Sequence, residues 1–246
     1  MFLFIRLLLA HFLGDFPFQF NAVYKLKLKG LRGIVPHALI IGGCAVALSW
    51  PYLSLPAVWF FIIFVTTTHL IQDAIKLNFN SPKNSFWTYL LDQFSHMGLI
   101  AVMFFTDLKK LQPPHSDGSN FFVWFYSSNE ILVYLIVVIA ATYNGHFLIR
   151  CFKDTFIKNA NPCDLYEKWF GMFERTTIVT FFFFRLPLWA IVPASLAIRP
   201  LTYVLLKKKL SLHRCFVAVP DMVLSWIIAL SCGSILFLLQ TRYPVY

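Results

Sequence analysis

The sequence predicts an all-α protein, a polytopic bundle of about six or seven transmembrane helices that forms one integral membrane domain over residues 1–246. Three observations predict this class. Of the residues, 59% are hydrophobic and only 13% are charged, whereas a soluble domain carries about 25% charged residues. Mean hydropathy is +0.68. The hydrophobic residues also gather in long runs separated by short polar loops.

Seven of these runs approach the length of about 20 residues that an α-helix needs to cross a bilayer. We expect them at 2–20, 34–55, 57–76, 86–105, 121–148, 172–193 and 217–240. The first run has no small-residue cleavage site after it, so we expect a retained helix and not a signal peptide. No internal repeat or low-complexity linker divides the chain, which favours a single domain.

The basic residues, which give a net charge of +10, lie mainly in the short loops. The first loop contains Lys25, Lys27, Lys29 and Arg32, and the third contains Lys76 and Lys83. Excess positive charge marks cytoplasmic loops, so the odd-numbered loops are predicted to be cytoplasmic. A basic cluster at 207–209 conflicts with this orientation. Loop cations of this kind contact anionic lipid headgroups, so the predicted partner is the bilayer and not nucleic acid.

Three short motifs place histidine and aspartate four residues apart inside apolar runs. They are His11-x-x-x-Asp15, His69-x-x-x-Asp73 and Asp92-x-x-x-His96. Residues four apart share one face of a helix. Ionisable groups at membrane depth are costly, and they are rare unless they pair, line a cavity or bind something. With alternating helix directions, all three pairs fall at the ends that face the odd-numbered loops, and His37 opens the second run at the same end. We therefore expect the three pairs to face one shared cavity, with His37 near its rim.

Imidazole and carboxylate groups without thiolate are ligands suited to Zn²⁺, Mn²⁺ or Fe²⁺. The five cysteines form no C-x-x-C pair, which argues against a sulfur site. The predicted ligands of one or two divalent ions are His11, Asp15, His37, His69, Asp73, Asp92 and His96. Of these, Asp15, Asp73 and Asp92 are the candidate catalytic groups. Gln19 and Gln93 are candidate hydrogen-bond partners of the ligands.

A bound divalent ion lowers the pKa of water and generates a nucleophile. The sequence therefore favours a metal-dependent hydrolase or transferase that acts on a lipid-linked or phosphorylated substrate. The candidate substrate-binding residues are Lys76, Glu174 and Arg175, since the cations suit a phosphate or carboxylate. Gly171, one turn before Glu174, is predicted to let a neighbouring helix approach closely.

Two other functions remain open. A transporter would use the same His/Asp set to bind a cation or relay protons, and a scaffold would use it only to lock helices together. A transporter needs a polar path to the opposite membrane face. The runs Phe181–Phe184 and Trp59–Ile63 offer no polar step, which favours the enzyme. Each i,i+4 pair by itself is also explained as a hydrogen-bonded pair on a helix surface.

The motifs resemble those of a bacterial membrane family called domain of unknown function 3307. The resemblance rests on Ala10–Phe16 with Gln19, Lys25 and His37, then on His69-x-x-x-Asp73-x-x-Lys76 and Asp92-Gln93-x-x-His96. Gly171-x-x-Glu174-Arg175 resembles a later element of that family, with Phe173 where leucine is usual. The resemblance implies a bacterial inner (plasma) membrane protein but no activity. More loosely, His-x-x-x-Asp near a helix end is similar to an element of inner-membrane proteins classed as metal-dependent hydrolases.

Overall fold

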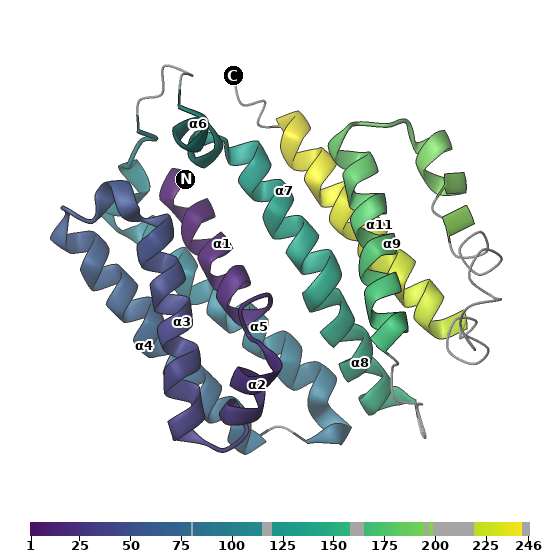
Figure 1. The fold of residues 1–246 in the computed structure, drawn as a ribbon, viewed down its shortest axis with the longest axis horizontal. Helices are drawn as coiled ribbons and strands as arrows, with labels where there is room; N and C mark the ends of the chain where they lie inside the picture. Colours follow the sequence, from purple (N-terminus) through teal and green to yellow (C-terminus); the bar gives the residue numbers. More distant parts are fainter. Residues whose placement is uncertain (80, 115–119, 158–164, 195–196, 199–218, 243–246) are drawn as a thin grey trace. The chain divides into compact units, whose positions relative to one another are not determined.

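The computed structural model describes residues 1–79, 81–114, 120–157, 165–194, 197–198 and 219–242 (Figure 1). The described residues form helices and no β-strand, so the all-α prediction is confirmed. The basic cluster at 207–209 lies outside them. Contacts within the chain divide it into two units, Met1–Ile136 and Val137–Tyr246, and each is described by itself. The single membrane domain over 1–246 stays a prediction.

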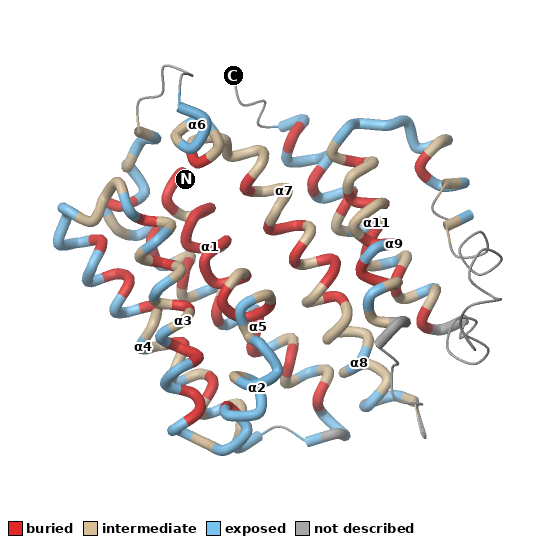
Figure 2. The backbone as a smooth tube through the Cα atoms, viewed as in Figure 1, coloured by how far each residue is buried: buried red, intermediate tan, exposed pale blue. Residues whose placement is uncertain are grey.

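The first unit is built around its N-terminal helix. Its main helices are α1 (Phe2–Asp15), α2 (Asn21–Lys27), α3 (Leu31–Leu48), α4 (Pro56–Phe79) and α5 (Ser85–Ala101). Helix α1 packs against α3 and α5, and α4 packs against both α3 and α5. Most of α1 is buried (Figure 2). This helix is therefore the central element, and its polar residues must find partners inside the unit.

The interior of this bundle is apolar over one half of its length. A buried cluster there includes Leu3 and Leu7 of α1, Ala45 of α3, Val58 of α4 and Ile100 of α5. The opposite ends of the same helices carry the His/Asp motifs. Burial of apolar surface contributes about 25 cal/mol per Å², so packing of these apolar side chains stabilises the bundle.

Short helices complete the first unit. They are η1 (Trp50–Tyr52), η2 (Pro82–Asn84), η3 (Val102–Phe105), η4 (Asp107–Lys110), α6 (Phe121–Ser127) and the start of α7 (Asn129–Ile139). Arg6 of α1 is fully buried against them. Its guanidinium donates to the carbonyl of Tyr126 and to Oδ1 of Asn129, and it lies 3.3 Å from the centre of the Phe2 ring. These bonds engage both Nη atoms of a buried cation that has no carboxylate partner among the described residues, while its Nε has no hydrogen-bond partner among them.

Four helical segments are long and apolar enough to cross a membrane: Leu31–Leu48, Pro56–Phe79, Asn129–Phe156 and Asp221–Arg242. The predicted count of six or seven spans is not confirmed. Helix α1 has 14 residues and extends about 21 Å, short of the ~30 Å hydrocarbon core, and α5, with 17 residues, is one residue shorter than α3. The predicted run 121–148 is also interrupted, because α6 ends at Ser127 and α7 begins at Asn129.

Helices α1 and α3 approach closely at Gly14. A Cβ atom there would lie 2.6 Å from Cγ1 and 3.0 Å from Cα of Ile41. We expect Gly14→Ala to lower stability by about 1–3 kcal/mol, because overpacking forces the backbones apart. Gly43→Ala is the matched control, since no atom lies within 4 Å of its Cβ position. Thermal unfolding in one detergent measures both, and equal midpoints would contradict the close packing.

The second unit continues from α7 through a π-helical turn, η5 (Ala140–Asn144), into α8 (Gly145–Phe156). Helices α9 (Leu165–Phe183) and α11 (Val219–Arg242) follow. Helix α9 packs along α11 and against η5, and an apolar cluster that includes Ile178, Phe182 and Ala229 forms the core of this unit.

Candidate functional site

The seven predicted metal ligands come together in the first unit, at the polar end of the bundle. They are His11, Asp15, His37, His69, Asp73, Asp92 and His96, which we call the His/Asp cluster. All seven are buried, with 7% exposure or less. The i,i+4 spacing explains why both members of each pair face the interior. The three motifs are therefore parts of one cluster and not separate helix-surface pairs.

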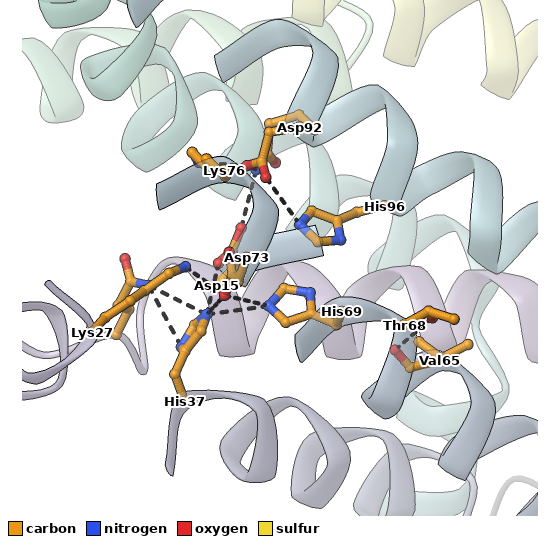
Figure 3. Close-up of polar contacts among 12 residues, drawn as sticks. Asp15, Lys27, His37, Val65, Thr68, His69, Asp73, Lys76, Asp92 and His96 are labelled. Atoms are coloured by element: carbon orange, nitrogen blue, oxygen red, sulfur yellow. Dashed lines mark hydrogen bonds and ion pairs between the residues drawn. The ribbon is translucent and has the colours of Figure 1, made fainter. Parts of the chain in front are cut away.

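His37 approaches three other members of the cluster (Figure 3). Its Nε2 is 3.1 Å from Oδ1 of Asp15, 3.5 Å from Oδ2 of Asp73 and 3.3 Å from Nε2 of His69. Its exposure is 0%, so the expectation that it lies near the rim is wrong. The close approach of α1 to α3 at Gly14 and the cover provided by α2 bury it.

Asp73 is paired with a lysine that comes from α2. Nζ of Lys27 lies 2.7 Å from Oδ2 of Asp73, and Nε2 of His69 lies 3.2 Å from the same oxygen. The chain turns back after α2 at Gly30, whose φ is 95°, a conformation that glycine adopts without strain. A Cβ at Gly33 would lie 1.7 Å from the carbonyl oxygen of Leu26. Only glycine at that position lets α2 pack so closely that Lys27 reaches Asp73.

Asp92 forms the other edge of the cluster. Its Oδ2 is 2.5 Å from Nζ of Lys76, and its Oδ1 is 3.3 Å from Nε2 of His96. Lys76, a predicted substrate-binding residue, keeps 22% of its side chain exposed. The Asp92 carboxylate therefore holds a partly accessible cation at this edge.

Both glutamines act as the sequence suggests. Nε2 of Gln93 donates to Oδ2 of Asp15 at 3.1 Å and to Oδ2 of Asp92 at 3.2 Å, so it bridges two carboxylates. Nε2 of Gln19 lies 3.3 Å from Nε2 of His37. These contacts fix the orientation of the groups on which any ligand would depend.

Four buried ligand atoms of the cluster have no hydrogen-bond partner among the described residues: Nε2 of His11, Nε2 of His96 and both carboxylate oxygens of Asp73. Of these, Oδ2 of Asp73 and Nε2 of His96 lie within ion-pair distance of Lys27 and Asp92. The rings of His69 and His96 stack at 4.1 Å, and the His11 ring lies 5.1 Å from that of His96. An unsatisfied buried polar atom costs about 1–3 kcal/mol. Such atoms in one place are expected where a cation or water completes the site.

Two sets of three side chains could each hold a metal ion: Asp15, His37 and His69, and His69, Asp73 and His96. In each set the ligand atoms lie within 4.8 Å of one another and all three residues are buried. The three carboxylates of the cluster face two lysine ammonium groups, which leaves one formal negative charge when the imidazoles are neutral. The donor set and its charge both suit a divalent cation.

Glu174 and Arg175 form a separate buried network in the second unit. Arg175 donates from Nε to the carbonyl of Ala141 at 2.5 Å, from Nη2 to that of Thr142 at 3.2 Å, and from Nη1 to Oγ of Ser225 at 3.0 Å. Ser225 in turn donates to Glu174 at 2.7 Å. Their predicted role in substrate binding stays a prediction.

The role expected of Gly171 is wrong. A Cβ at this position would lie 3.1 Å from Nη1 of Arg175, in the same helix and one turn away. The missing side chain makes room for the guanidinium and not for a neighbouring helix.

Sequence reasoning missed Lys27 as a member of the site. In the sequence it is one of several loop lysines, and its charge predicts only which side of the membrane the loop faces. Two features could have found it. Gly30 and Gly33 flank the turn that folds α2 back, and no acidic residue occurs between Asp15 and Asp73, so a buried loop cation has few possible partners.

Comparisons with known proteins agree with the motif resemblance. Residues 3–117 match the sequence model of a family described as "Protein of unknown function (DUF3307)". No curated protein and no solved structure matches the chain. The matched residues contain the whole His/Asp cluster, together with Lys27 and Lys76. Residues 3–117 of this chain are therefore similar to the DUF3307 family, whose function is unknown, and the His/Asp cluster lies inside the matched part.

Proposed function

We propose that the first unit is a metal-dependent hydrolase or transferase embedded in a bacterial inner membrane, and that its substrate is phosphorylated or lipid-linked. One observation carries the proposal. A bundle with a largely apolar interior buries four histidines and three aspartates in one cluster, and four of their ligand atoms lack hydrogen-bond partners among the described residues. Burying this many ionisable side chains costs free energy, and such clusters are rare in apolar bundles unless they bind a ligand.

The ion is proposed to bind His69, Asp73 and His96, with His11 beside it. This set contains the unsatisfied atoms of Asp73 and His96, whereas Asp15 and His37 of the other set already hydrogen bond to each other. A neutral imidazole has one free lone pair, so His69 serves only one set at a time. We therefore expect one tightly bound divalent ion per chain, with Zn²⁺, Mn²⁺ and Fe²⁺ as the candidates.

A divalent ion in this position would supply a Lewis acid and lower the pKa of water. The residues around it have roles that follow from their contacts. Asp92, next to both His96 and Lys76, is placed to accept a proton. Lys76 is partly exposed and is placed to hold a phosphate oxygen, as a lysine does at phosphate sites. Asp15 and Gln93 orient His37 and Asp92.

The apolar half of the bundle favours an enzyme over a transporter. Beyond the cluster, the buried positions of α1, α3, α4 and α5 in the apolar core carry Leu, Ala, Val, Phe and Ile side chains, and the buried charge of Arg6 is bonded to Tyr126 and Asn129. A transporter needs polar groups along such a path. This apolar core supports a site that opens to one membrane face only.

Metal analysis of detergent-purified protein tests the ion and its ligands. We expect about one divalent ion per wild-type chain and less than about a tenth of that in His69→Ala and His96→Ala, because a three-ligand site does not survive the loss of one ligand. His37→Ala should keep most of the metal. His146→Ala, in the second unit, is the matched control.

Wild-type protein without stoichiometric metal would sink the proposal. Equal metal loss in His37→Ala and His96→Ala would indicate that the other set, which contains His37, takes part in binding the ion.

Phosphate release from phosphorylated lipids tests the reaction on the same preparations. Asp92→Asn should retain the metal and lose at least about 100-fold in rate, as expected for a general acid or base. If the wild type binds metal, releases no phosphate and takes up cations into proteoliposomes, the transporter is the better assignment.

A further inference from the structure

The outer face of α2 and its two flanks carry exposed apolar and basic side chains side by side. The exposed apolar residues are Phe20 (63%), Tyr24 (39%) and Leu28 (57%), and the exposed basic residues are Lys25, Lys29 and Arg32. We call these six residues the α2 surface. It lies in the first unit and belongs to the segment that places Lys27 against Asp73.

Helical spacing separates the lysines of this surface from the His/Asp cluster. Phe20, Tyr24 and Leu28 are four residues apart, and so are Lys25 and Lys29, so each set follows one face of α2. Lys27 lies about 200° around the helix from Lys25, given 100° per residue, and it is buried. Lys25 therefore points away from the site, and the directions of Tyr24 and Leu28 lie between those of Lys27 and Lys25.

The positive charge of the α2 surface favours an anionic ligand. Lys25, Lys29 and Arg32 make no ion pair with the described residues. The sequence has no aspartate or glutamate between Asp15 and Asp73. Three unpaired cations next to exposed aromatic and leucine side chains are typical of a helix that lies in the headgroup layer of a membrane.

The position of α2 along the bundle agrees with this chemistry. Helix α3, one of the four segments apolar enough to span a bilayer, begins at Leu31, just after the turn that follows α2. Its 18 residues extend about 27 Å, close to the ~30 Å hydrocarbon core. The start of α3, and therefore α2, falls at the boundary between hydrocarbon and headgroups.

We propose that the α2 surface binds the headgroups of anionic phospholipids. Lys25, Lys29 and Arg32 contact the phosphates, and Phe20, Tyr24 and Leu28 enter the acyl layer beneath them. The close packing of α2 on α3 at Gly33 holds the bound headgroup beside the His/Asp cluster. The inference goes beyond the proposed function, because lipid binding at α2 requires neither the metal nor catalysis.

Binding of a short-chain phosphatidylglycerol to the detergent-purified full chain tests the proposal. Dioctanoyl phosphatidylcholine and glycerol 3-phosphate serve as the comparison ligands. We expect phosphatidylglycerol to bind more tightly than either. Lys25→Gln with Lys29→Gln should weaken its binding about 25-fold, since each basic residue near an anionic lipid surface contributes about fivefold. Phosphatidylcholine binding should not change.

Two controls complete the experiment. Lys109→Gln with Lys110→Gln removes two exposed lysines elsewhere in the first unit and should leave phosphatidylglycerol binding unchanged. His69→Ala should also leave it unchanged, which separates this proposal from the proposed metal site. Equal binding of the two lipids, equal loss in both double variants, or equally tight binding of glycerol 3-phosphate would each overturn the proposal.

Discussion

Lys27→Met is expected to destabilise the first unit by about 3–5 kcal/mol, the usual cost of removing one partner of a buried ion pair. Lys27 is 7% exposed and Asp73 is 1% exposed, and their charged atoms lie 2.7 Å apart. Without the ammonium group, three carboxylates would share one lysine. The Asp73 charge would then be buried with histidine contacts alone.

Thermal unfolding of metal-depleted protein in a fixed detergent measures this effect. Lys25→Met is the matched control, because Lys25 is exposed on the same helix and forms no ion pair with the described residues. Adding Asp73→Asn to Lys27→Met should recover much of the loss, since it removes the uncompensated charge. A Lys27→Met protein as stable as Lys25→Met would contradict the pairing. With metal added back, Lys27→Met should bind the ion more tightly than the wild type, because no ammonium group competes for Asp73.

Arg175→Met is expected to destabilise the second unit by about 3–5 kcal/mol as well. The substitution leaves the Ala141 and Thr142 carbonyls without the guanidinium, and Ser225 without its donor. Glu174 keeps its bonds from Ser225 and Trp226 but loses the nearby positive charge. Methionine fills much of the volume, so the loss reports on polar contacts more than on packing.

Two further variants provide values with which the loss of stability in Arg175→Met can be compared. Ser225→Ala should cost about 1–2 kcal/mol, as expected for a buried hydroxyl that bridges two groups. Arg150→Met removes an arginine that is 61% exposed and should change stability by less than about 0.5 kcal/mol. If Arg175→Met unfolds at the wild-type temperature but impairs phosphate release, Arg175 serves the substrate and not the fold.

The spacing of the motifs was enough to predict the cluster. A separation of four residues fixes two side chains on one helix face, and alternating helix directions place the three pairs at one end of the bundle. Both inferences need only helix geometry and the cost of burying charge. They predicted the grouping of His11, Asp15, His69, Asp73, Asp92 and His96 without any knowledge of which helices pack together.

The parts that could not be predicted depend on packing between segments. A lysine in a loop has the same sequence signature whether it faces solvent or Asp73, and only the close approach at Gly33 decides which. The position of His37 at the start of an apolar run predicts a place near the rim, but α2 packs against α3 and His37 is buried. Arg6 gave no spacing signal, because its partners Tyr126 and Asn129 are more than 100 residues away.

The π-helical turn η5 has a consequence for the rotational phase of α8. A π-turn contains one more residue than the equivalent α-turn, and one residue corresponds to about 100° of rotation. This extra residue therefore sets the azimuth of every α8 side chain, including Lys153, whose Nζ lies 2.8 Å from Oδ2 of Asp221. Deleting one residue within Ala140–Asn144 would straighten the helix and turn Lys153 away from Asp221. The single inserted residue thus determines which face of α8 meets α11.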